Sequence, residues 1–439
     1  MKDKKVHFVG IGGIGMSALA QMLAHDGAVV TGSDREAGPV TEMLEGKGIK
    51  VFIGQKAENI PTDADVVVYS DAVPADNPER ARATELSIPQ FSYFEMLGKV
   101  SEGKKTVAIA GTHGKTTTTG MLAKILQDAG AEPTAIVGSI VKDFGSNYLA
   151  GSSDLFVVEA CEYRDHLLEL SPQVLVLTNV EWDHTDYFPS FGALQETFRK
   201  ALSKVPEDGV IITNPHDKNI VPLLATAKAR VVDYTDEPAP TIGRSDLPMV
   251  AYDLKLPGKF NQSNARAAAA AARALLPGIS DAALAASLAD FHGTWRRFEY
   301  KGKSANGSDV YDDYAHHPTA VRATLEALRA KTSGTVFVAF HPHLYSRTRD
   351  LLDEFATSFG SADKVFIAPI YAAREADDGS ISSEMLAEHI RANGVDATAL
   401  DSFDAIERAL AEAGPGDAVM TMGAGDIYKV ADALVAPKK

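Results

Sequence analysis

Short apolar stretches alternate with helix-like stretches along most of this 439-residue chain. The first apolar stretch, KVHFV at residues 5–9, leads through a glycine turn into the helix-like MSALAQMLAHDG at 16–27. The same order restarts after the polar break EGKKT at 102–106, and again after WRRFEYKG at 295–302. Strands that alternate with helices form parallel sheets covered by helices on both faces. The sequence therefore predicts an α/β fold built from three such units.

The length of the chain supports this division, because one hydrophobic core stops growing at about 250–300 residues. We expect three domains, at residues 1–103, 104–297 and 298–439. Proline and glycine recur over residues 205–243, from VPEDGVIITN to DYTDEPAPTIG. This stretch predicts loops with antiparallel strands on a domain rim. The alanine-rich NQSNARAAAAAARALL, at 261–276, predicts a buried helix opened by Asn and Ser caps.

Charge and cysteine content exclude several classes of partner. A net charge of −16 disfavours nucleic acid, whose phosphates would be repelled. Cys161 is the single cysteine, so an intramolecular disulfide is ruled out, and we expect it to be an inert small residue. No apolar run approaches the roughly 18 residues of a membrane span. We therefore expect a soluble, cytoplasmic protein without a membrane or nucleic-acid partner.

The first glycine turn, in FVGIGGIGMS at residues 8–17, has the pattern G-x-G-x-x-G. Gly10, Gly12 and Gly15 are its glycines, and Asp34 follows 19 residues after the last of them. Bare backbone and a helix start can face any diphosphate, so this pattern alone is weak evidence for NAD. The pattern predicts a diphosphate cradle, which is a loop that binds a diphosphate group, and one interpretation is that the protein is a nicotinamide-dependent oxidoreductase.

A second cradle lies in VAIAGTHGKTTTT at 107–119, where a strand, a glycine turn and a helix start follow one another. Lys115 is placed to neutralise the β- and γ-phosphates of a nucleoside triphosphate, and the Thr116 hydroxyl to complete a Mg²⁺ shell. The loop is the tighter G-x-x-G-K-T, since Ile109 stands where G-x-x-x-x-G-K-[ST] has its first glycine. We expect ATP to bind the loop residues Gly111, Thr112, His113, Gly114, Lys115, Thr116 and Thr117.

An acid and a histidine follow the next two apolar stretches. Glu159 ends DLFVVE, and His184 lies in EWDHTDY. The carboxyl ends of parallel strands meet at one edge of a sheet, so both side chains should reach the edge that carries the loop. Together with Thr116 they form an oxygen and imidazole set that suits Mg²⁺ or Mn²⁺.

These motifs together resemble those of the Mur ligase family along nearly the full chain. GTHGKTTTT is similar to the ATP loop of that family, and six further blocks agree with it: EACEY, TNVEWDHTDYF, PGKFNQSNA, WRRFEY, DDYAHHPTAV and FHPHLYSRTRD. The set is most similar to the branch that joins L-alanine to UDP-N-acetylmuramate. The resemblance implies three domains: a Rossmann-like N-terminal one, a central P-loop ATPase-like one, and a Rossmann-like C-terminal one.

The resemblance also implies what each cradle holds. The first glycine turn would bind a UDP-sugar rather than a dinucleotide, through Gly10, Ile11, Gly12, Gly13, Gly15, Ser17, Asp34 and Ser70. His113 would touch either the phosphates or the sugar substrate. Thr116 and Glu159 would hold a metal that bridges the ATP phosphates, and His184 a second metal. Phe198 stands where several relatives carry a carboxylated lysine, with Lys200 out of register, so we expect no such lysine.

For the nucleotide and the amino acid, the resemblance implies residues nearer the C-terminus. Asn264 would bind the adenine side of ATP, and Arg297 the γ-phosphate. Asp313 would bind the ribose, and Tyr314 would stack on adenine. The amino acid would meet His316, His343 and Arg347, the last through its carboxylate. This chain departs from the family at Leu344, where many relatives have an arginine.

The implied activity is an ATP-dependent amide-bond formation through an acyl phosphate. We expect Lys115, Glu159, His184, Arg297 and His316 to be catalytic, with His316 as a candidate base for the amine. Three alternatives remain at this point: another Mur-type ligase that reattaches a recovered tripeptide, an NAD-dependent oxidoreductase, and a non-catalytic nucleotide-binding module. The oligomeric state is left open.

Overall fold

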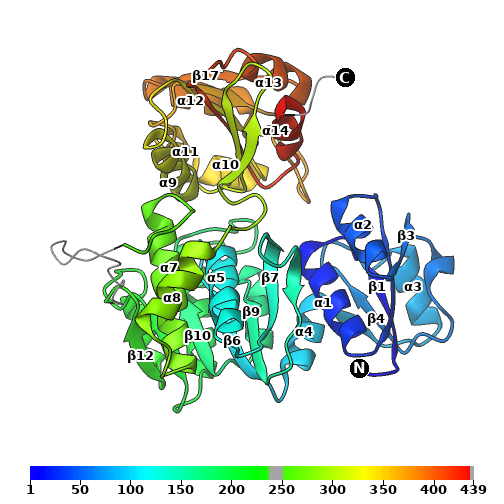
Figure 1. Cartoon of the computed structure of the whole chain (residues 1–439). Helices are drawn as coiled ribbons and strands as arrows, with labels where there is room; N and C mark the ends of the chain where they lie inside the picture. Colours follow the sequence, from blue (N-terminus) through cyan, green and yellow to red (C-terminus); the bar gives the residue numbers. More distant parts are fainter. Residues whose placement is uncertain (237–250, 436–439) are drawn as a thin grey trace. The chain divides into compact units, whose positions relative to one another are not determined.

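The computed structural model describes residues 1–236 and 251–435. The described residues form three separate sheets and divide into two compact units (Figure 1). Unit 1 comprises Met1–Val180, Gln195–Asp253 and Asn264–Phe291, and unit 2 comprises Glu181–Leu194, Leu254–Ser263 and His292–Lys439. Among the described residues, none of the helices has the length and apolar character needed to cross a membrane.

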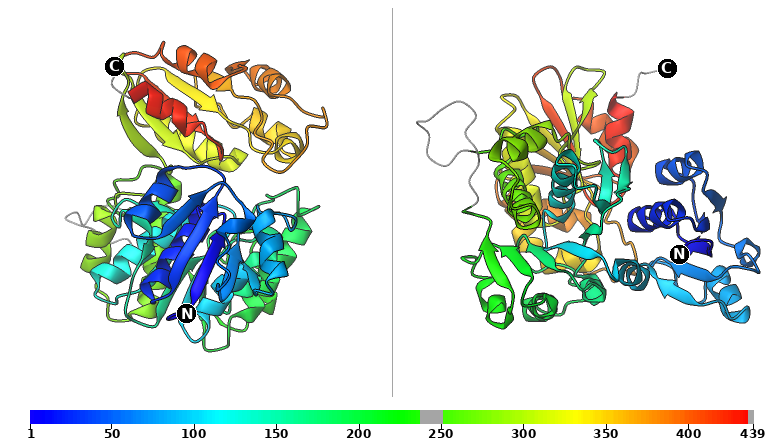
Figure 2. Two further views of the ribbon diagram at one scale, coloured as in Figure 1. Left: turned by 90° about the vertical axis from the view of Figure 1, so that its right-hand side faces the viewer. Right: turned by 60° about the horizontal axis from the view of Figure 1, so that its bottom comes forward.

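The N-terminal sheet of unit 1 has the strand order β3-β2-β1-β4-β5, and all its strands are parallel. Figure 2 (left) shows its strands in blue. The order reverses beside β1, so the crevice for a ligand opens at the carboxyl ends of β1 and β4. The strands are β1 Lys5–Val9, β2 Val29–Asp34, β3 Lys50–Ile53, β4 Val66–Tyr69 and β5 Gln90–Ser92; the helices are α1 Ile14–His25, α2 Pro39–Gly46, η1 Ala57–Asn59, α3 Pro78–Glu85 and α4 Tyr93–Ser101.

The central sheet of unit 1 has the order β12-β11-β10-β6-β9-β7-β8. β7 and β8 form an antiparallel hairpin, and the other pairs are parallel. The strands are β6 Lys105–Ala110, β7 Thr134–Val141, β8 Ser146–Leu149, β9 Leu155–Glu159, β10 Val174–Leu177, β11 Val210–Thr213 and β12 Arg230–Asp233. The helices of this part of the chain are α5 Lys115–Asp128, η2 Tyr163–Glu169, α6 Phe191–Lys204, η3 Val221–Thr226, α7 Lys259–Leu275 and α8 Asp281–Asp290.

The prediction of antiparallel strands over residues 205–243 was wrong for the part that the structure describes. β11 lies parallel to β10, and β12 lies parallel to β11. α6 connects β10 to β11, and η3 connects β11 to β12. Such crossover connections return the chain to the same end of the sheet, which makes neighbouring strands parallel. Residues 237–243 of this stretch lie outside the described residues.

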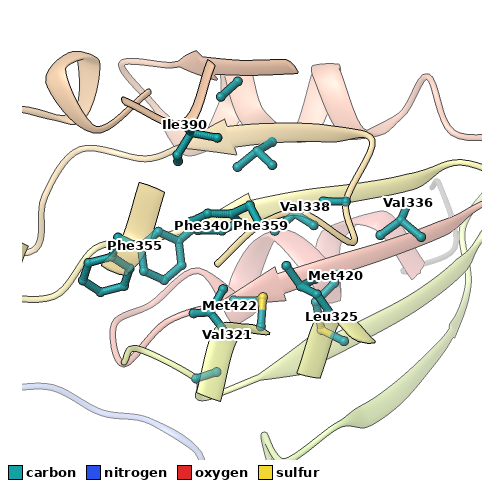
Figure 3. Close-up of a cluster of buried hydrophobic side chains, with 14 of the residues drawn as sticks. Val321, Leu325, Val336, Val338, Phe340, Phe355, Phe359, Ile390, Met420 and Met422 are labelled. Carbon is teal, nitrogen blue, oxygen red and sulfur yellow. The ribbon is translucent and has the colours of Figure 1, made fainter. Parts of the chain in front are cut away.

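Unit 2 carries a sheet of order β13-β14-β18-β15-β16-β17, in which the β13–β14 pair is antiparallel. Figure 3 shows the apolar cluster on one face of this sheet, where Phe340 packs against Phe355 and Phe359. The strands are β13 Glu299–Lys303, β14 Asp309–Asp313, β15 Val336–Phe340, β16 Lys364–Ile367, β17 Asp396–Ala399 and β18 Ala418–Met422. The helices are α9 Pro318–Arg329, α10 Tyr345–Asp350, α11 Leu352–Ala356, α12 Ser383–Ala392, α13 Phe403–Leu410 and α14 Tyr428–Val435.

Candidate functional site

The phosphate loop lies between the end of β6 and the start of α5. Gly111 and Gly114 have φ values of 121° and 85°. Residues other than glycine rarely adopt such positive φ values. A Cβ on Gly114 would collide with the carboxamide oxygen of Asn264. Asn264, on α7, therefore lies directly against the phosphate loop.

Asn179, just after β10, fixes the shape of this loop. Its Oδ1 accepts the His113 N–H at 2.9 Å, and its Nδ2 donates to the His113 carbonyl at 2.9 Å. Its own carbonyl accepts the Thr112 N–H at 3.1 Å. Thr178 adds a hydroxyl bond to the His113 carbonyl at 2.6 Å. The sequence analysis missed both residues, although they form the TN that opens TNVEWDHTDYF.

Lys115 begins α5, and its ammonium group is held by a buried acid. Nζ lies 3.1 and 3.0 Å from the two carboxylate oxygens of Glu162, which is 1% exposed, and donates to the Gly111 carbonyl. Burial lowers the pKa of Lys115, but the carboxylates around it outweigh burial and raise that pKa above its usual value. Glu162 was missed, although it is the second acid of EACEY. Burial and Glu162 raise the pKa of Cys161 to about 12, so this cysteine stays an unreactive thiol.

Thr116 and Glu159 are brought together as the sequence predicts. The Thr116 hydroxyl donates to Glu159 Oε1 at 3.1 Å, and Glu159 Oε2 accepts the Gly138 N–H at 2.8 Å. When two neighbouring oxygens bind the same octahedral Mg²⁺, each at about 2.1 Å, they lie about 3 Å apart. The separation of the Thr116 and Glu159 oxygens therefore fits a shared Mg²⁺. Thr117 is buried in the same helical turn. His184 belongs to unit 2, and its place beside Thr116 and Glu159 stays a prediction.

The helix after His184, α6, has a phenylalanine at the position where several relatives carry a carboxylated lysine. Phe198, on α6, is buried, whereas Lys200 is exposed. The absence of a carboxylated lysine from this helix stays a prediction.

The first four amides of the N-terminal glycine turn bind within the protein. Gly10 and Ile11 donate to the Ser33 carbonyl, Gly12 to Asp34 Oδ2, and Gly13 to the Gly10 carbonyl, over 2.8–3.2 Å. α1 begins at Ile14, and the first three amides of a helix have no partner inside it. The amides of residues 14–16 are therefore the ones that can meet a diphosphate, while Asp34 holds the turn itself.

Two side chains border this turn. A Cβ on Gly10 would lie 3.1 Å from the Ser70 Cβ, and one on Gly15 would lie 2.7 Å from the Tyr93 ring. Ser70 therefore lies beside the cradle as predicted, and the sequence analysis missed Tyr93. Ser17, on the buried face of α1, donates to the Ile14 carbonyl at 2.9 Å.

We expect Gly12→Val to abolish binding of the UDP-sugar and to leave ATP binding within about threefold of wild type. A Cβ at residue 12 would lie 2.8 Å from Asp34 Oδ2, so it displaces the carboxylate that holds the turn. The ATP loop belongs to a different sheet of the same unit. Calorimetric titration of each ligand tests this, and a parallel loss of both affinities contradicts it.

In unit 2, the residues expected to meet ATP cluster where β14 ends. Asp313 accepts the N–H groups of Phe298 and Ala315, each at 2.7 Å, and burial raises its pKa to about 6. The Arg297 guanidinium lies 5.0 Å from the centre of the Tyr314 ring. Arg296, which the sequence analysis did not assign, is buried and binds Asp312 at 2.8 Å.

The residues expected to meet the amino acid also come together in unit 2. Arg347 is 2% exposed, and its Nε and Nη2 lie 2.8 and 2.7 Å from Asp183 Oδ1. Its Nη1 lies 3.0 Å from His343 Nδ1. The His316 ring lies 6.1 Å from the His343 ring, and its Nε2 is 4.0 Å from Asp183 Oδ2. Asp183 was missed, although EWDHTDY contains it.

Burial and the charge of Arg347 together set the protonation of this cluster. Burial raises the pKa of Asp183, but Arg347 and the nearby histidines hold that pKa well below its usual value. Burial and Arg347 together lower the pKa of His343 to about 3 and that of His316 well below its usual value. Both imidazoles are therefore neutral near pH 7. Leu344, where many relatives have arginine, is fully buried with φ 73° and adds no cation.

Comparison with known protein families identifies the family of this chain. Residues 5–105 match the Mur ligase family, catalytic domain; residues 109–272 match the Mur ligase middle domain; and residues 296–425 match the Mur ligase, glutamate ligase domain. The chain belongs to the Mur ligase family. It has the three-domain α/β architecture of that family, as the sequence predicted, and the oxidoreductase reading of the first glycine turn is wrong.

This Mur ligase is similar over its whole length to ligases of known name. It is 41% identical to UDP-N-acetylmuramate–L-alanine ligase of Acetivibrio thermocellus, with 100% of this chain and 97% of the relative covered. It is 39% identical to the enzyme of the same name from Clostridium botulinum, with 99% and 98% covered.

Two solved structures share its fold. The UDP-N-acetylmuramate–alanine ligase of Thermotoga maritima matches with a TM-score of 0.79 and 27% identity, over 98% of each chain. A murein peptide ligase of Psychrobacter arcticus matches with a TM-score of 0.73 and 25% identity, over 99% of this chain and 100% of that one.

Proposed function

We propose that this Mur ligase joins L-alanine to UDP-N-acetylmuramate with consumption of ATP, in the synthesis of peptidoglycan precursors. The full-length similarity to ligases named for this reaction carries the proposal. The two cradles of unit 1 support it, because the reaction needs a site for a UDP-sugar and another for ATP. We also place the enzyme in the cytoplasm, because a chain with a single cysteine fits a reducing compartment.

The chemistry requires activation of a carboxylate. The lactyl carboxylate of UDP-N-acetylmuramate attacks the γ-phosphorus of ATP, which gives an acyl phosphate and ADP. The amine of L-alanine then attacks the acyl carbon, and phosphate leaves. Lys115 and Arg297 offset the charge that develops on the transferred phosphoryl group. Asn264, Asp313 and Tyr314 bind the adenosine end.

We assign the metal site to Thr116 and Glu159, with His184 for a second ion. The oxygen separation at Thr116 and Glu159 supports this, because it suits a hard cation. A bound Mg²⁺ supplies Lewis-acid stabilisation of phosphate oxygens. Lys115 holds the phosphates from the helix start, and Gly111, Thr112, His113, Gly114 and Thr117 shape the loop around them.

For the amino-acid substrate, we propose that Arg347 binds the carboxylate of L-alanine, with His316 and His343 beside it. A neutral imidazole with a lowered pKa is a weak proton acceptor. His316 Nδ1 lies 2.9 Å from the Tyr314 carbonyl, which places the ring proton there and leaves Nε2 as an acceptor. His316 Nε2 therefore orients the amine by accepting a hydrogen bond from it. His316 can act as a base only if the amine is already neutral when it binds.

We propose the UDP-sugar site at Gly10, Ile11, Gly12, Gly13, Gly15, Ser17, Asp34 and Ser70. The domain boundaries proposed with it are 1–103, 104–297 and 298–439. The family segments at 5–105, 109–272 and 296–425 support boundaries near these positions.

Phosphate release tests the function. With UDP-N-acetylmuramate and ATP present, we expect release to depend on an added amino acid and to be fastest with L-alanine. Glycine, L-serine and the tripeptide L-alanyl-γ-D-glutamyl-meso-diaminopimelate serve as competitors. Faster release with the tripeptide would favour murein peptide ligation, the activity named for a structural neighbour. No release with any acceptor would point to a non-catalytic nucleotide-binding module.

A further inference from the structure

A network of buried amide and hydroxyl groups joins the start of α1 to the β7–β8 hairpin, within unit 1. Asn147, on β8, is 0% exposed. Its Nδ2 donates to the Ile14 carbonyl at 2.5 Å and to the Ser17 hydroxyl at 2.9 Å. Its Oδ1 accepts from Gln21 Nε2 at 2.9 Å. One side chain of the central sheet thus contacts three residues of the helix that follows the glycine turn.

The partners of Asn147 are themselves held in place. Gln21 Oε1 accepts the Ser146 hydroxyl at 3.0 Å and the Lys47 ammonium at 2.6 Å. Gln21 and Ser146 are also buried. A buried network in which every member is paired is rigid, because loss of one bond leaves a desolvated polar atom without compensation. The first turn of α1 is therefore tied firmly to β8.

That turn carries the amides that can bind a diphosphate, at residues 14–16. The N-cap residue Gly13 has no side chain to hold the helix start. We propose that Asn147 is a positioning residue for the UDP-sugar: it holds the first turn of α1 in the orientation that receives the diphosphate. This inference rests on the proposed function, and it makes the UDP-sugar site a joint product of the N-terminal and central sheets.

Asn147→Asp tests this. The substitution keeps the size of the side chain and the oxygen that accepts from Gln21, but it points an anionic oxygen at the Ile14 carbonyl. We expect the KM for UDP-N-acetylmuramate to rise at least about tenfold, with kcat and the KM for ATP within about twofold. In hydrogen exchange, the amide of Ser17, which donates to the Gly13 carbonyl at 2.8 Å across the first turn, should lose protection. The buried carboxylate should also lower the melting temperature.

Asn219→Asp is the matched control. Asn219 Nδ2 donates to the Val180 carbonyl at 2.8 Å in the same unit, without contact to the glycine turn. We expect its three kinetic constants to stay near wild type. Gln21→Ala is a milder second variant, which removes one partner of Asn147; it should raise the same KM in the same direction.

Equal constants for UDP-N-acetylmuramate in Asn147→Asp and Asn219→Asp would overturn the inference. So would a parallel effect on all three constants, with kcat lowered and both KM values raised to a similar extent, because that is the mark of global damage. Failure of the wild type to bind UDP-N-acetylmuramate in calorimetry would refute the proposed function instead. The exchange of the Ser17 amide would still decide whether Asn147 positions the turn.

Discussion

Lys115→Ala is expected to lower the turnover number at least about a hundredfold, because it removes the cation that we propose offsets the charge on the transferred phosphoryl group. It should also destabilise the protein. The buried carboxylate of Glu162 loses the ammonium group 3.0 Å away, and breaking such a pair costs about 3–5 kcal/mol. Turnover is measured by phosphate release, and the free energy of unfolding by urea titration.

Two further variants separate the effects on chemistry and on stability. In Lys115→Met combined with Glu162→Gln, no buried charge is left unpaired, so stability should recover while turnover stays low. Lys124→Ala, on the same helix, removes ion pairs to Asp128 at 3.0 Å and Asp290 at 3.2 Å and should leave turnover unchanged. A double variant that turns over within tenfold of wild type would refute the role of Lys115.

Arg347→Lys is expected to raise the KM for L-alanine about ten- to a hundredfold and to leave the KM for ATP nearly unchanged. A charge-assisted hydrogen bond contributes about 1.5–3 kcal/mol. The guanidinium group of Arg347 binds Asp183 through Nε and Nη2 and has further N–H groups for a substrate carboxylate. A lysine ammonium group lacks this planar arrangement of donors, so it cannot bind Asp183 and the substrate in the same way. Steady-state titration of each substrate in turn measures the two constants.

Arg374→Lys provides the control for this substitution. Arg374 binds Asp186 with Nε at 2.8 Å, but its side chain is 41% exposed, so water can replace what the lysine loses. Its effect on both KM values should be small. Arg347→Lys could instead change the KM for ATP or the turnover number and leave the KM for L-alanine unchanged. In that case Arg347 binds the nucleotide, and our assignment is wrong.

Much of the fold could be predicted from local pattern. The strands at KVHFV, VAIAG and DLFVVE were predicted because a buried strand in a parallel sheet is a continuous apolar run. Short or polar strands escaped, such as β5, β8 and β17, with the sequences QFS, SNYL and DATA. The direction of β11 and β12 also escaped, because strand direction depends on the path of the connection and not on the strand residues.

By itself, the sequence determined where the chain can cradle phosphate, because a glycine turn between a strand and a helix acts through its own backbone. It also determined the pairing of Thr116 with Glu159, since both end up at the carboxyl edge of adjacent parallel strands. Only the tertiary structure decided what holds the functional side chains. Arg347 meets Asp183 across 164 positions, and Lys115 meets Glu162 across 47. These pairs depend on three-dimensional packing, because a buried charge is stabilised by an opposite charge that is close in space, however distant it is in the sequence.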